Sequence, residues 1–419
     1  MEIRVPYGHS FLTATFPDHI CVDIIEAPEV PPAADPLGIV HKALENLLGN
    51  VTWSDFANVH SVAIAISDKT RPVPHHQLLP PLIEHLAAIG IPDSAITFYI
   101  AVGAHPPMTP DEFPNILPND IHRRYKVVSH NAEDDDLLLD LGKTYHGTPV
   151  WSNKGYVNSD LKIVVGNIEP HQFAGFSGGV KTAAIGLSAL KTINFNHALM
   201  THPDSQIGKY ETNPARQDIE EIGKKIIVHI ALNSILNQSR QIVRVLAGDP
   251  VAVMQAGIPL SRQICQVGVE SEYSLMISSP GGYPKDINLY QAQKGLSHAA
   301  LIMRPGGTVI LVAACPEGTG SPHYEEWMHG KQSYEDVLQS FKAEGFRIGP
   351  HKAYQIARDA SKLRLMFCSG MDETFASALL LNPIGNFQTA VDLALADLQP
   401  GDHVGILPHA SSTIPYILD

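Results

Sequence analysis

The sequence predicts an α/β protein made of two domains, and three observations support this expectation. Of the 419 residues, 44% are hydrophobic and 17% are charged, so the chain can bury large cores. Short β-branched apolar stretches bounded by turn residues alternate with helix-like segments, as in layered α/β folds. The alternation restarts after about Gly257. We expect one domain over residues 1–258, completed by residues 386–419, a second over residues 259–385, and a binding cleft between them.

The strands expected in the first domain are short apolar runs. Helix signals are clearest after Asp35, which can cap a helix over Pro36–Leu48 that Gly49 would end. A second helix is expected at Pro214–Lys225. The expected strands are Ser61–Ile66, Ala95–Val102, Lys126–Val128, Leu161–Val165, Ile227–Ile235 and Gln241–Leu246.

The second domain repeats this alternation. Pro383-Ile384-Gly385 suits a return crossing, so the last thirty or so residues could belong to either domain. Strands are expected at Ser274–Ser279, Thr308–Ala313, Leu363–Cys368 and His403–Leu407, and helices at Asp286–Met303, Tyr334–Glu344, Tyr354–Ala360 and Thr389–Leu398.

Charge and targeting signals exclude several classes of protein. Asp and Glu number 43 against 29 Lys and Arg, which gives a formal net charge of −14 without a basic run, so nucleic-acid binding is not expected. The N-terminal residues lack the regions of a signal peptide, and no run approaches ~18 apolar residues. We therefore expect a cytoplasmic protein that does not enter a membrane.

The most unusual segment is the glycine-rich run from Gly166 to Thr182, which follows a predicted strand. Ligands of α/β proteins gather at such strand ends. The run resembles a phosphate-binding loop, but Val180 stands where that motif needs its second glycine, which disfavours a nucleoside triphosphatase. Gly175, Gly178 and Gly179 still allow close approach to a ligand, and N–H groups at the start of the following helix favour an anion. The alternative is a flexible loop.

Reactive side chains lie where predicted strands end. His171 opens the glycine-rich run, Lys181 closes it, and His105 follows another strand. Imidazole exchanges protons near neutral pH, and a desolvated lysine amine can form a covalent link. His197 is a possible metal ligand, although one imidazole cannot hold a catalytic transition metal by itself. A single histidine is more often structural than functional.

Charged groups follow a further strand of the first domain and also occur in the second. Asp68 and Arg71 place an acid and a fixed positive charge at one strand end, and Arg71 suits a carboxylate or a phosphate. Tyr290 and Lys294 are four residues apart and share one face of a helix. A solvated helix face is the alternative for that pair.

Taken together, these segments resemble the nickel-dependent lactate racemase family over nearly the whole chain. Their order and spacing match the family, and this combination is what makes the resemblance specific. The matching segments are Asp68–Pro72, Gly103–Pro106, His171–Lys181, Asn194–His197 and Tyr290–Lys294.

The resemblance implies a nickel-pincer nucleotide as cofactor. In this family a pyridinium-3,5-bisthiocarboxylic acid mononucleotide holds nickel through two sulfur-bearing arms and a ring carbon. Lys181 would tether it covalently, His197 would be the protein ligand to nickel, and cofactor-synthesis proteins would be needed for maturation. The residues that would lie near the nucleotide are Asp68, Thr70, Gly175, Ser177, Gly178 and Gly179.

The resemblance also implies an isomerase: a racemase or epimerase of a small 2-hydroxy acid, lactate or a relative. His105 and His171 would serve opposite faces of the substrate carbon while hydride moves reversibly to the cofactor through a 2-keto acid. The second domain would close over the substrate. Its carboxylate and hydroxyl would meet Arg71, Tyr290, Gln291 and Lys294.

Two alternatives remain open. The family member acting on lactate has a tryptophan where this chain has Tyr354, so Tyr354 or Trp327 could shape a site for a larger 2-hydroxy acid. A nonenzymatic carrier or sensor of a nickel or nucleotide cofactor is the second alternative. Having both His105 and His171 argues against a carrier, because binding needs no base on each face. A zinc hydrolase is disfavoured, since no H-E-x-x-H motif occurs.

Overall fold

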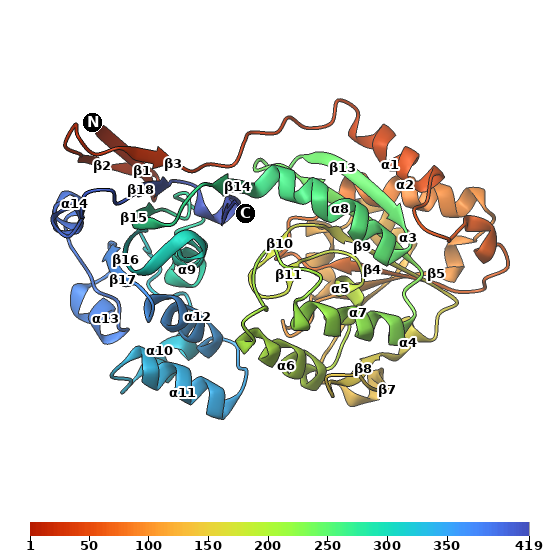
Figure 1. Ribbon diagram of the computed structural model, residues 1–419. Helices are drawn as coiled ribbons and strands as arrows, with labels where there is room; N and C mark the ends of the chain where they lie inside the picture. The colour runs from red at the N-terminus through yellow and green to blue at the C-terminus, as the bar shows by residue number, and fades with distance from the viewer. Residues whose placement is uncertain (419) are drawn as a thin grey trace. The chain divides into compact units, whose positions relative to one another are not determined.

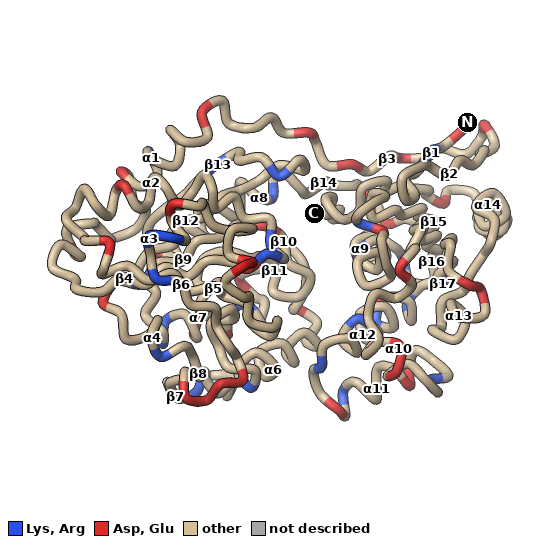
Figure 2. Tube along the Cα trace, turned by 180° about the vertical axis from the view of Figure 1, so that it is seen from behind, with Lys and Arg blue, Asp and Glu red and all other residues tan. Residues whose placement is uncertain are grey.

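The computed structural model describes residues 1–418, and these residues form two compact units (Figure 1). The N-terminal unit is Glu29–Ile264, and the C-terminal unit combines Met1–Pro28 with the chain from Cys265 onward. Both units contain a mostly parallel sheet covered by helices, so the expected α/β class with two domains is confirmed. Lys and Arg are interspersed with Asp and Glu over both units, as Figure 2 shows.

The sheet of the N-terminal unit has six strands in the order β13-β12-β9-β4-β5-β6. All pairs are parallel except β12 with β13. The strands are β4 (Val62–Ser67), β5 (Ile96–Ala101), β6 (Lys126–Ser129), β9 (Leu161–Asn167), β12 (Ile230–Leu236) and β13 (Ile242–Gly248), beside the small pairs β7 (Leu138–Lys143) with β8 (Pro149–Asn153) and β10 (Pro170–His171) with β11 (Gly175–Phe176).

Helices cover both faces of this sheet. On one face, Leu44 and Leu82 join fully buried Ile64 and Phe98 in a single core. Gly166 faces the other side, where an added side chain would meet the helix that follows the glycine-rich run. The helices of the unit are α1 (Pro36–Glu45), α2 (His75–Ala88), α3 (Asn119–Arg124), α4 (Lys154–Val157), α5 (Lys181–Ala184), α6 (Leu190–Ala198), α7 (Pro214–Ile226) and α8 (Pro250–Cys265).

Strand order determines where a ligand can bind. The chain steps from β4 to β5 and then β6, and afterwards continues on the other side of β4 with β9 and β12. In open parallel sheets, ligands bind where this direction reverses, beyond the carboxyl ends of the strands. Here that point lies between β4 and β9. The loops that leave β4, β5 and β9 carry Asp68, His105 and His171.

The sheet of the C-terminal unit has five parallel strands in the order β17-β16-β15-β18-β3. The strands are β1 (Glu2–Tyr7), β2 (Ser10–Thr15), β3 (Val22–Ile24), β14 (Gln266–Val269), β15 (Tyr273–Ser278), β16 (Met303–Val312), β17 (Arg364–Cys368), β18 (Val404–Leu407) and β19 (Ile414–Ile417), and the helices are α9 (Leu289–Ala299), α10 (Pro322–Met328), α11 (Tyr334–Glu344), α12 (Pro350–Ala360), α13 (Glu373–Ala378) and α14 (Phe387–Ala396). The β1–β2 hairpin and α14 share a core with one face of the sheet, and α9 to α12 share a core with the other.

The expected domain boundaries need correction. The segments 1–28 and 386–419 were expected in the first domain, but β3 and β18 pair with each other in the C-terminal sheet, and β18 also pairs with β15. Val404 and Ile406 fill the core of that unit, so its sheet would lose buried surface without them. The boundary expected at residue 258 falls inside α8, because Pro259 lies within a continuous helix. No helix among residues 1–418 is long and apolar enough to span a membrane.

Candidate functional site

His105 is joined to a buried carboxylate. Its Nδ1 lies 2.7 Å from Oδ2 of Asp68, whose side chain is 6% exposed, while the His105 side chain is 46% exposed. Thr70 donates to Oδ1 of Asp68 from its hydroxyl at 2.6 Å and from its backbone N–H at 3.1 Å. Burial raises the pKa of Asp68, but the hydrogen bonds from His105 and Thr70 outweigh it and leave the pKa below its usual value. Of the two residues expected near the nucleotide, Asp68 thus binds a histidine and Thr70 binds Asp68.

The glycine-rich loop is held in place by buried polar side chains from distant elements. Arg216 of α7 is fully buried and donates to the carbonyls of Phe176 at 2.8 Å and Gly178 at 3.1 Å, while Glu220 neutralises its charge. Asn233 of β12 accepts from the N–H of Gly179 at 2.7 Å. These anchors argue against the flexible-loop alternative.

Packing explains the glycines of the loop. Gly175 has a φ of +71°, and an added Cβ would lie 1.6 Å from the carbonyl oxygen of Lys209. At Gly179, with a φ of +56°, a Cβ would lie 2.7 Å from Met254. The following helix α5 has only four residues, so it does not offer the N-terminal anion site expected from the sequence.

Lys181 begins α5 and has an unusual ammonium group. Burial lowers its pKa from 10.5 to about 7, and the positive charges of Arg71 and Arg216 add to this effect, while Glu169 opposes it. The residue keeps part of its surface accessible, but its ammonium lies deep enough among protein atoms to lose hydration. About half of the molecules therefore carry a neutral, nucleophilic amine at pH 7.

Phe173 links two of the predicted histidines. Its ring meets the His171 ring edge-on at 4.8 Å and the His197 ring at 4.9 Å. The backbone N–H of Ala174 donates to Nδ1 of His171 at 3.3 Å. His171 and His197 thus both pack against one buried aromatic ring. Phe173 lies within the glycine-rich run, but nothing in its local sequence distinguished it from an ordinary core residue.

His197 is oriented by a buried polar network. Asn196 donates from Nδ2 to the carboxylate of Asp218 and to a backbone carbonyl, so its Oδ1 is the acceptor for Nδ1 of His197 at 3.1 Å. Thr144 and Thr148 also donate to Asp218. Nδ1 therefore carries the proton, and Nε2 is the nitrogen with the lone pair that a metal needs.

These residues fit the cofactor that the resemblance implies. A neutral amine at Lys181 can bond covalently to a carbonyl-type carbon, and the donor set of His197 is one imidazole nitrogen in a defined orientation. Such a set suits a metal that arrives with other ligands already attached. Among residues 1–418, no group of three or more His, Cys, Asp or Glu could hold a metal ion.

Arg71 lies in the same unit, three residues after Asp68. Its side chain is exposed, and within the described chain no carboxylate lies within 4 Å of its guanidinium. Its charge reaches Lys181 strongly enough to contribute to the lowered pKa of that amine. The guanidinium can therefore serve as the anion partner expected from the sequence.

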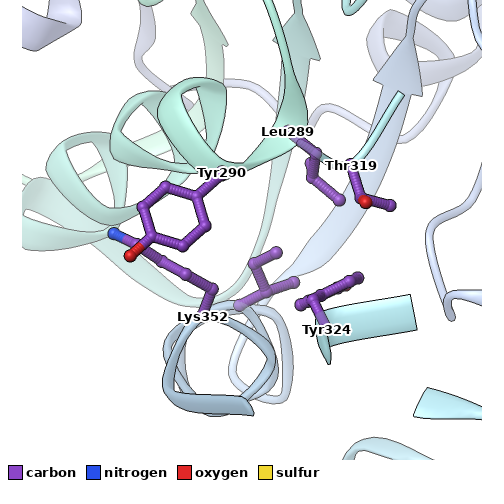
Figure 3. Close-up of a pocket in the computed structure, with 6 residues that line it drawn as sticks. Leu289, Tyr290, Thr319, Tyr324 and Lys352 are labelled. Carbon is purple, nitrogen blue, oxygen red and sulfur yellow. The ribbon is translucent and has the colours of Figure 1, made fainter. Parts of the chain in front are cut away.

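The C-terminal unit carries the second group of predicted residues on α9. Lys294 donates to Oε1 of Gln291 at 2.9 Å, and the Tyr290 hydroxyl lies 3.4 Å from Nε2 of His351. Figure 3 shows Tyr290 beside Lys352, whose ammonium lies 4.7 Å from the ring centre. Next to them is a crevice that is too constricted to hold a water molecule. Its lining residues are Leu289, Tyr290, Thr319, Tyr324, Lys352 and Ile356.

Tyr354 and Trp327 do not line this crevice. Tyr354 is 8% exposed and stacks on Phe341 of α11 with ring centres 4.8 Å apart. Trp327 meets the same ring edge-on at 6.4 Å and donates to Glu344. The aromatic wall expected from the sequence therefore packs within the helical layer of the C-terminal unit, where Tyr354 fills the core.

Comparisons with known proteins agree over most of the chain. Residues 7–208 match the family model of the lactate racemase N-terminal domain, and residues 269–414 match that of the C-terminal domain. A lactate racemase from Lactiplantibacillus plantarum is 33% identical over 300 residues, which is 71% of this chain and 70% of that one. A lactate racemase from Thermoanaerobacterium thermosaccharolyticum is 30% identical over 349 residues, 82% of each chain.

Solved structures show the same likeness. The lactate racemase apoprotein from Thermoanaerobacterium thermosaccharolyticum superposes with a TM-score of 0.90 at 27% identity, covering 99% of this chain and 100% of that one. A Thermotoga maritima protein shares the fold with a TM-score of 0.64 at 19% identity, covering 93% of this chain and all of that one. Given these matches, the chain belongs to the lactate racemase family.

Proposed function

We propose that the protein is a racemase or epimerase of a 2-hydroxy acid, lactate or a close relative. The observation that carries this proposal is the pair of histidines beyond β5 and β9, the strands on either side of β4, with His105 bound to the buried Asp68 and His171 within the anchored glycine-rich loop. A carrier protein needs neither group. The family and the names of the relatives support the same reaction.

We propose a nickel-pincer nucleotide as its cofactor, attached to Lys181 and with nickel bound by His197. When bound, this group supplies a hydride acceptor and donor, which no amino-acid side chain provides. The neutral amine of Lys181 supports the covalent link, and the network behind His197 holds its Nε2 ready to coordinate. Ser177, Gly178 and Gly179 remain candidates for contacts with the nucleotide.

The protein side of the reaction is proton transfer and positioning. A histidine takes the hydroxyl proton of the substrate while the hydrogen on carbon 2 leaves as hydride. The substrate becomes a flat 2-keto acid, and return of hydride to the other face with a proton from a histidine gives the opposite enantiomer. Asp68 stabilises the imidazolium that forms at His105, because it accepts from Nδ1.

Substrate binding is proposed to use cations. Arg71 presents a planar fork that matches a carboxylate. In the C-terminal unit, Tyr290, Gln291 and Lys294 are proposed to contact the carboxylate and hydroxyl of the substrate. Lys294 donates a hydrogen bond to Oε1 of Gln291, and this bond orients the Gln291 side chain.

The test is to produce the protein together with cofactor-synthesis proteins and measure intact mass, nickel content and activity on optically pure 2-hydroxy acids. The expected result is a mass increment, nickel bound in proportion to it, and loss of optical purity for lactate or a relative. A fully loaded protein that leaves every acid of the panel optically pure would contradict the proposal and favour a carrier.

A further inference from the structure

The hydrogen bonds of His105 and His171 differ in direction, and from this difference we infer that the two histidines are not interchangeable. In the resting protein His105 is ready to act as a base, and Asp68 is the positioning residue that makes it so. His171 rests as a neutral hydrogen-bond donor that must change tautomer before it can accept a proton. The catalytic consequences of this inference rest on the proposed function. The two resting tautomers are a property of the protein without cofactor and can be measured there.

The partner of His105 can only accept hydrogen bonds. The pKa of Asp68 is lowered, so the group is a carboxylate at neutral pH, and Thr70 already donates to its other oxygen. The 2.7 Å contact therefore requires the proton to sit on Nδ1 of His105. In the neutral ring the lone pair is then on Nε2, at the half-exposed end of the side chain. A substrate hydroxyl at that end meets a base.

The group that meets Nδ1 of His171 can only donate. The backbone N–H of Ala174 points to Nδ1 of His171, so this nitrogen holds the lone pair and Nε2 carries the proton. A substrate hydroxyl that approaches Nε2 meets a donor. To become a base there, the ring must move its proton from Nε2 to Nδ1 and give up the bond from Ala174.

The geometry of the loop makes the Ala174 bond difficult to avoid. His171 pairs with Gly175 across a tight turn, and the N–H of Phe176 donates to the carbonyl of Ala174 at 2.7 Å. The carbonyl of Gly175 accepts from the N–H of Gly208 at 3.1 Å, and Arg216 donates to the carbonyl of Phe176. The backbone around Ala174 is therefore anchored on both sides, and its N–H stays directed at the His171 ring.

Two consequences follow for catalysis. For the enantiomer whose hydroxyl faces His105, the O–H proton moves to Nε2 and forms an imidazolium held by Asp68, while the C2–H bond breaks and its electron pair leaves with the hydride. For the enantiomer facing His171, a tautomer change must come first. Formation of keto acid in a single turnover should then be a few-fold to about tenfold slower from that enantiomer, since one ordinary hydrogen bond is given up.

The premise can be tested by ¹⁵N NMR of histidine-labelled protein without cofactor, at about two pH units above the ordinary imidazole pKa of about 6.5. Signals that disappear in His105→Gln and in His171→Gln assign the two rings. The expected result is the Nδ1–H form for His105 and the Nε2–H form for His171. The same tautomer for both rings would overturn the inference.

Asp68→Asn tests the positioning role, with Asp111→Asn as the matched control, because Asp111 is exposed whereas Asp68 is the buried partner of His105. Asp68→Asn should shift the tautomer of His105 and lower kcat at least about 100-fold, with cofactor loading retained. The control should change neither. Loss of cofactor with an unchanged His105 tautomer would overturn the assignment of Asp68. If the tautomers are as expected but no acid is racemised, the proposed function fails and the resting forms stand.

Discussion

The lowered pKa of Lys181 predicts that this one amine reacts at neutral pH in protein without cofactor. With a pKa of about 7, about half of the Lys181 side chains are neutral at pH 7, whereas an ordinary lysine with a pKa of about 10.4 is neutral in about one molecule in 2,500. The pH is varied between 5 and 11, and the parent protein is compared with the variant Arg71→Met. Removing that cation should raise the pKa of Lys181, because Arg71 is one of the causes of the shift.

The assay is brief labelling with a limiting amount of acetic anhydride, followed by peptide mass spectrometry. Lys224, exposed near the end of α7, serves as the reference for a solvated amine. Labelling of Lys181 should rise with a midpoint near pH 7 in the parent and at higher pH in Arg71→Met. A labelling midpoint near pH 10 in the parent would refute the claim that burial desolvates the Lys181 ammonium.

The lowered pKa of Lys181 also makes the free energy of unfolding depend on pH. Between pH 7 and about 10.4 the unfolded chain holds more protons at this residue than the folded one, so this group makes stability rise with pH across that window. Lowering the pKa of Lys181 to about 7 thus destabilises the folded state relative to the unfolded state by about 4 kcal/mol at pH 7. Lys181→Met should raise the unfolding free energy by roughly 3–5 kcal/mol at pH 7, with the gain disappearing above about pH 10.5, as measured by denaturant unfolding.

Three further predictions follow from other contacts. Asn196→Ala should reduce nickel bound per tethered cofactor by weakening affinity about 10- to 100-fold, measured by metal analysis beside intact mass; unchanged nickel would remove Asn196 from the support of His197. Tyr354→Trp should leave the ratio of kcat/KM between lactate and a larger 2-hydroxy acid unchanged while lowering stability by about 1–3 kcal/mol, and a shifted ratio would return Tyr354 to the substrate site. Arg216→Met should lower stability by about 3–5 kcal/mol, because it leaves Glu220 buried without its partner, and the double variant with Glu220→Gln should recover much of the loss in thermal unfolding; no recovery would contradict the ion-pair explanation.

Much of the fold could be predicted because buried parallel strands are nearly continuous apolar runs. The strands from β4 to β13 in the main sheet and β15 to β18 were all expected within a few residues, and Asp35 caps α1 as predicted. For the N- and C-terminal segments, the sequence could not predict which of the two units they join. An apolar run such as Val404–Leu407 carries no local mark of the sheet it joins, and the three residues of β3 are too few to give a pattern.

The candidate site was predictable only where its residues lie in short motifs. His105, His171 and Lys181 were found from strand ends and spacing, but Arg216 and Asp218 were not, since Arg216 reaches Phe176 and Asp218 reaches Thr148 across 40 and 70 residues. Such long-range polar contacts leave no periodic signal in the sequence.

The helix that carries Tyr354 begins earlier than expected, while a place for Tyr354 in the substrate site stays a prediction. The helix was expected to begin at Tyr354, but it begins at Pro350, so the tyrosine lies inside it. On that helix Lys352 and Ile356 are four residues apart and share the face that lines the crevice, whereas Tyr354 lies about 200° away from Lys352 and stacks on Phe341. The helix start therefore decided which side chains line the crevice.

The central claim, racemisation of a 2-hydroxy acid by hydride transfer, is tested most directly by following deuterium. Optically pure lactate, or the acid that reacts best, carries deuterium at carbon 2 and is incubated in ordinary water with cofactor-loaded protein. Chiral chromatography coupled to mass spectrometry then measures deuterium in both enantiomers. The account predicts a racemic product that keeps its deuterium, because the hydrogen of carbon 2 leaves and returns as hydride. A racemic product that has lost deuterium to solvent would mean removal of that hydrogen as a proton and would contradict the account.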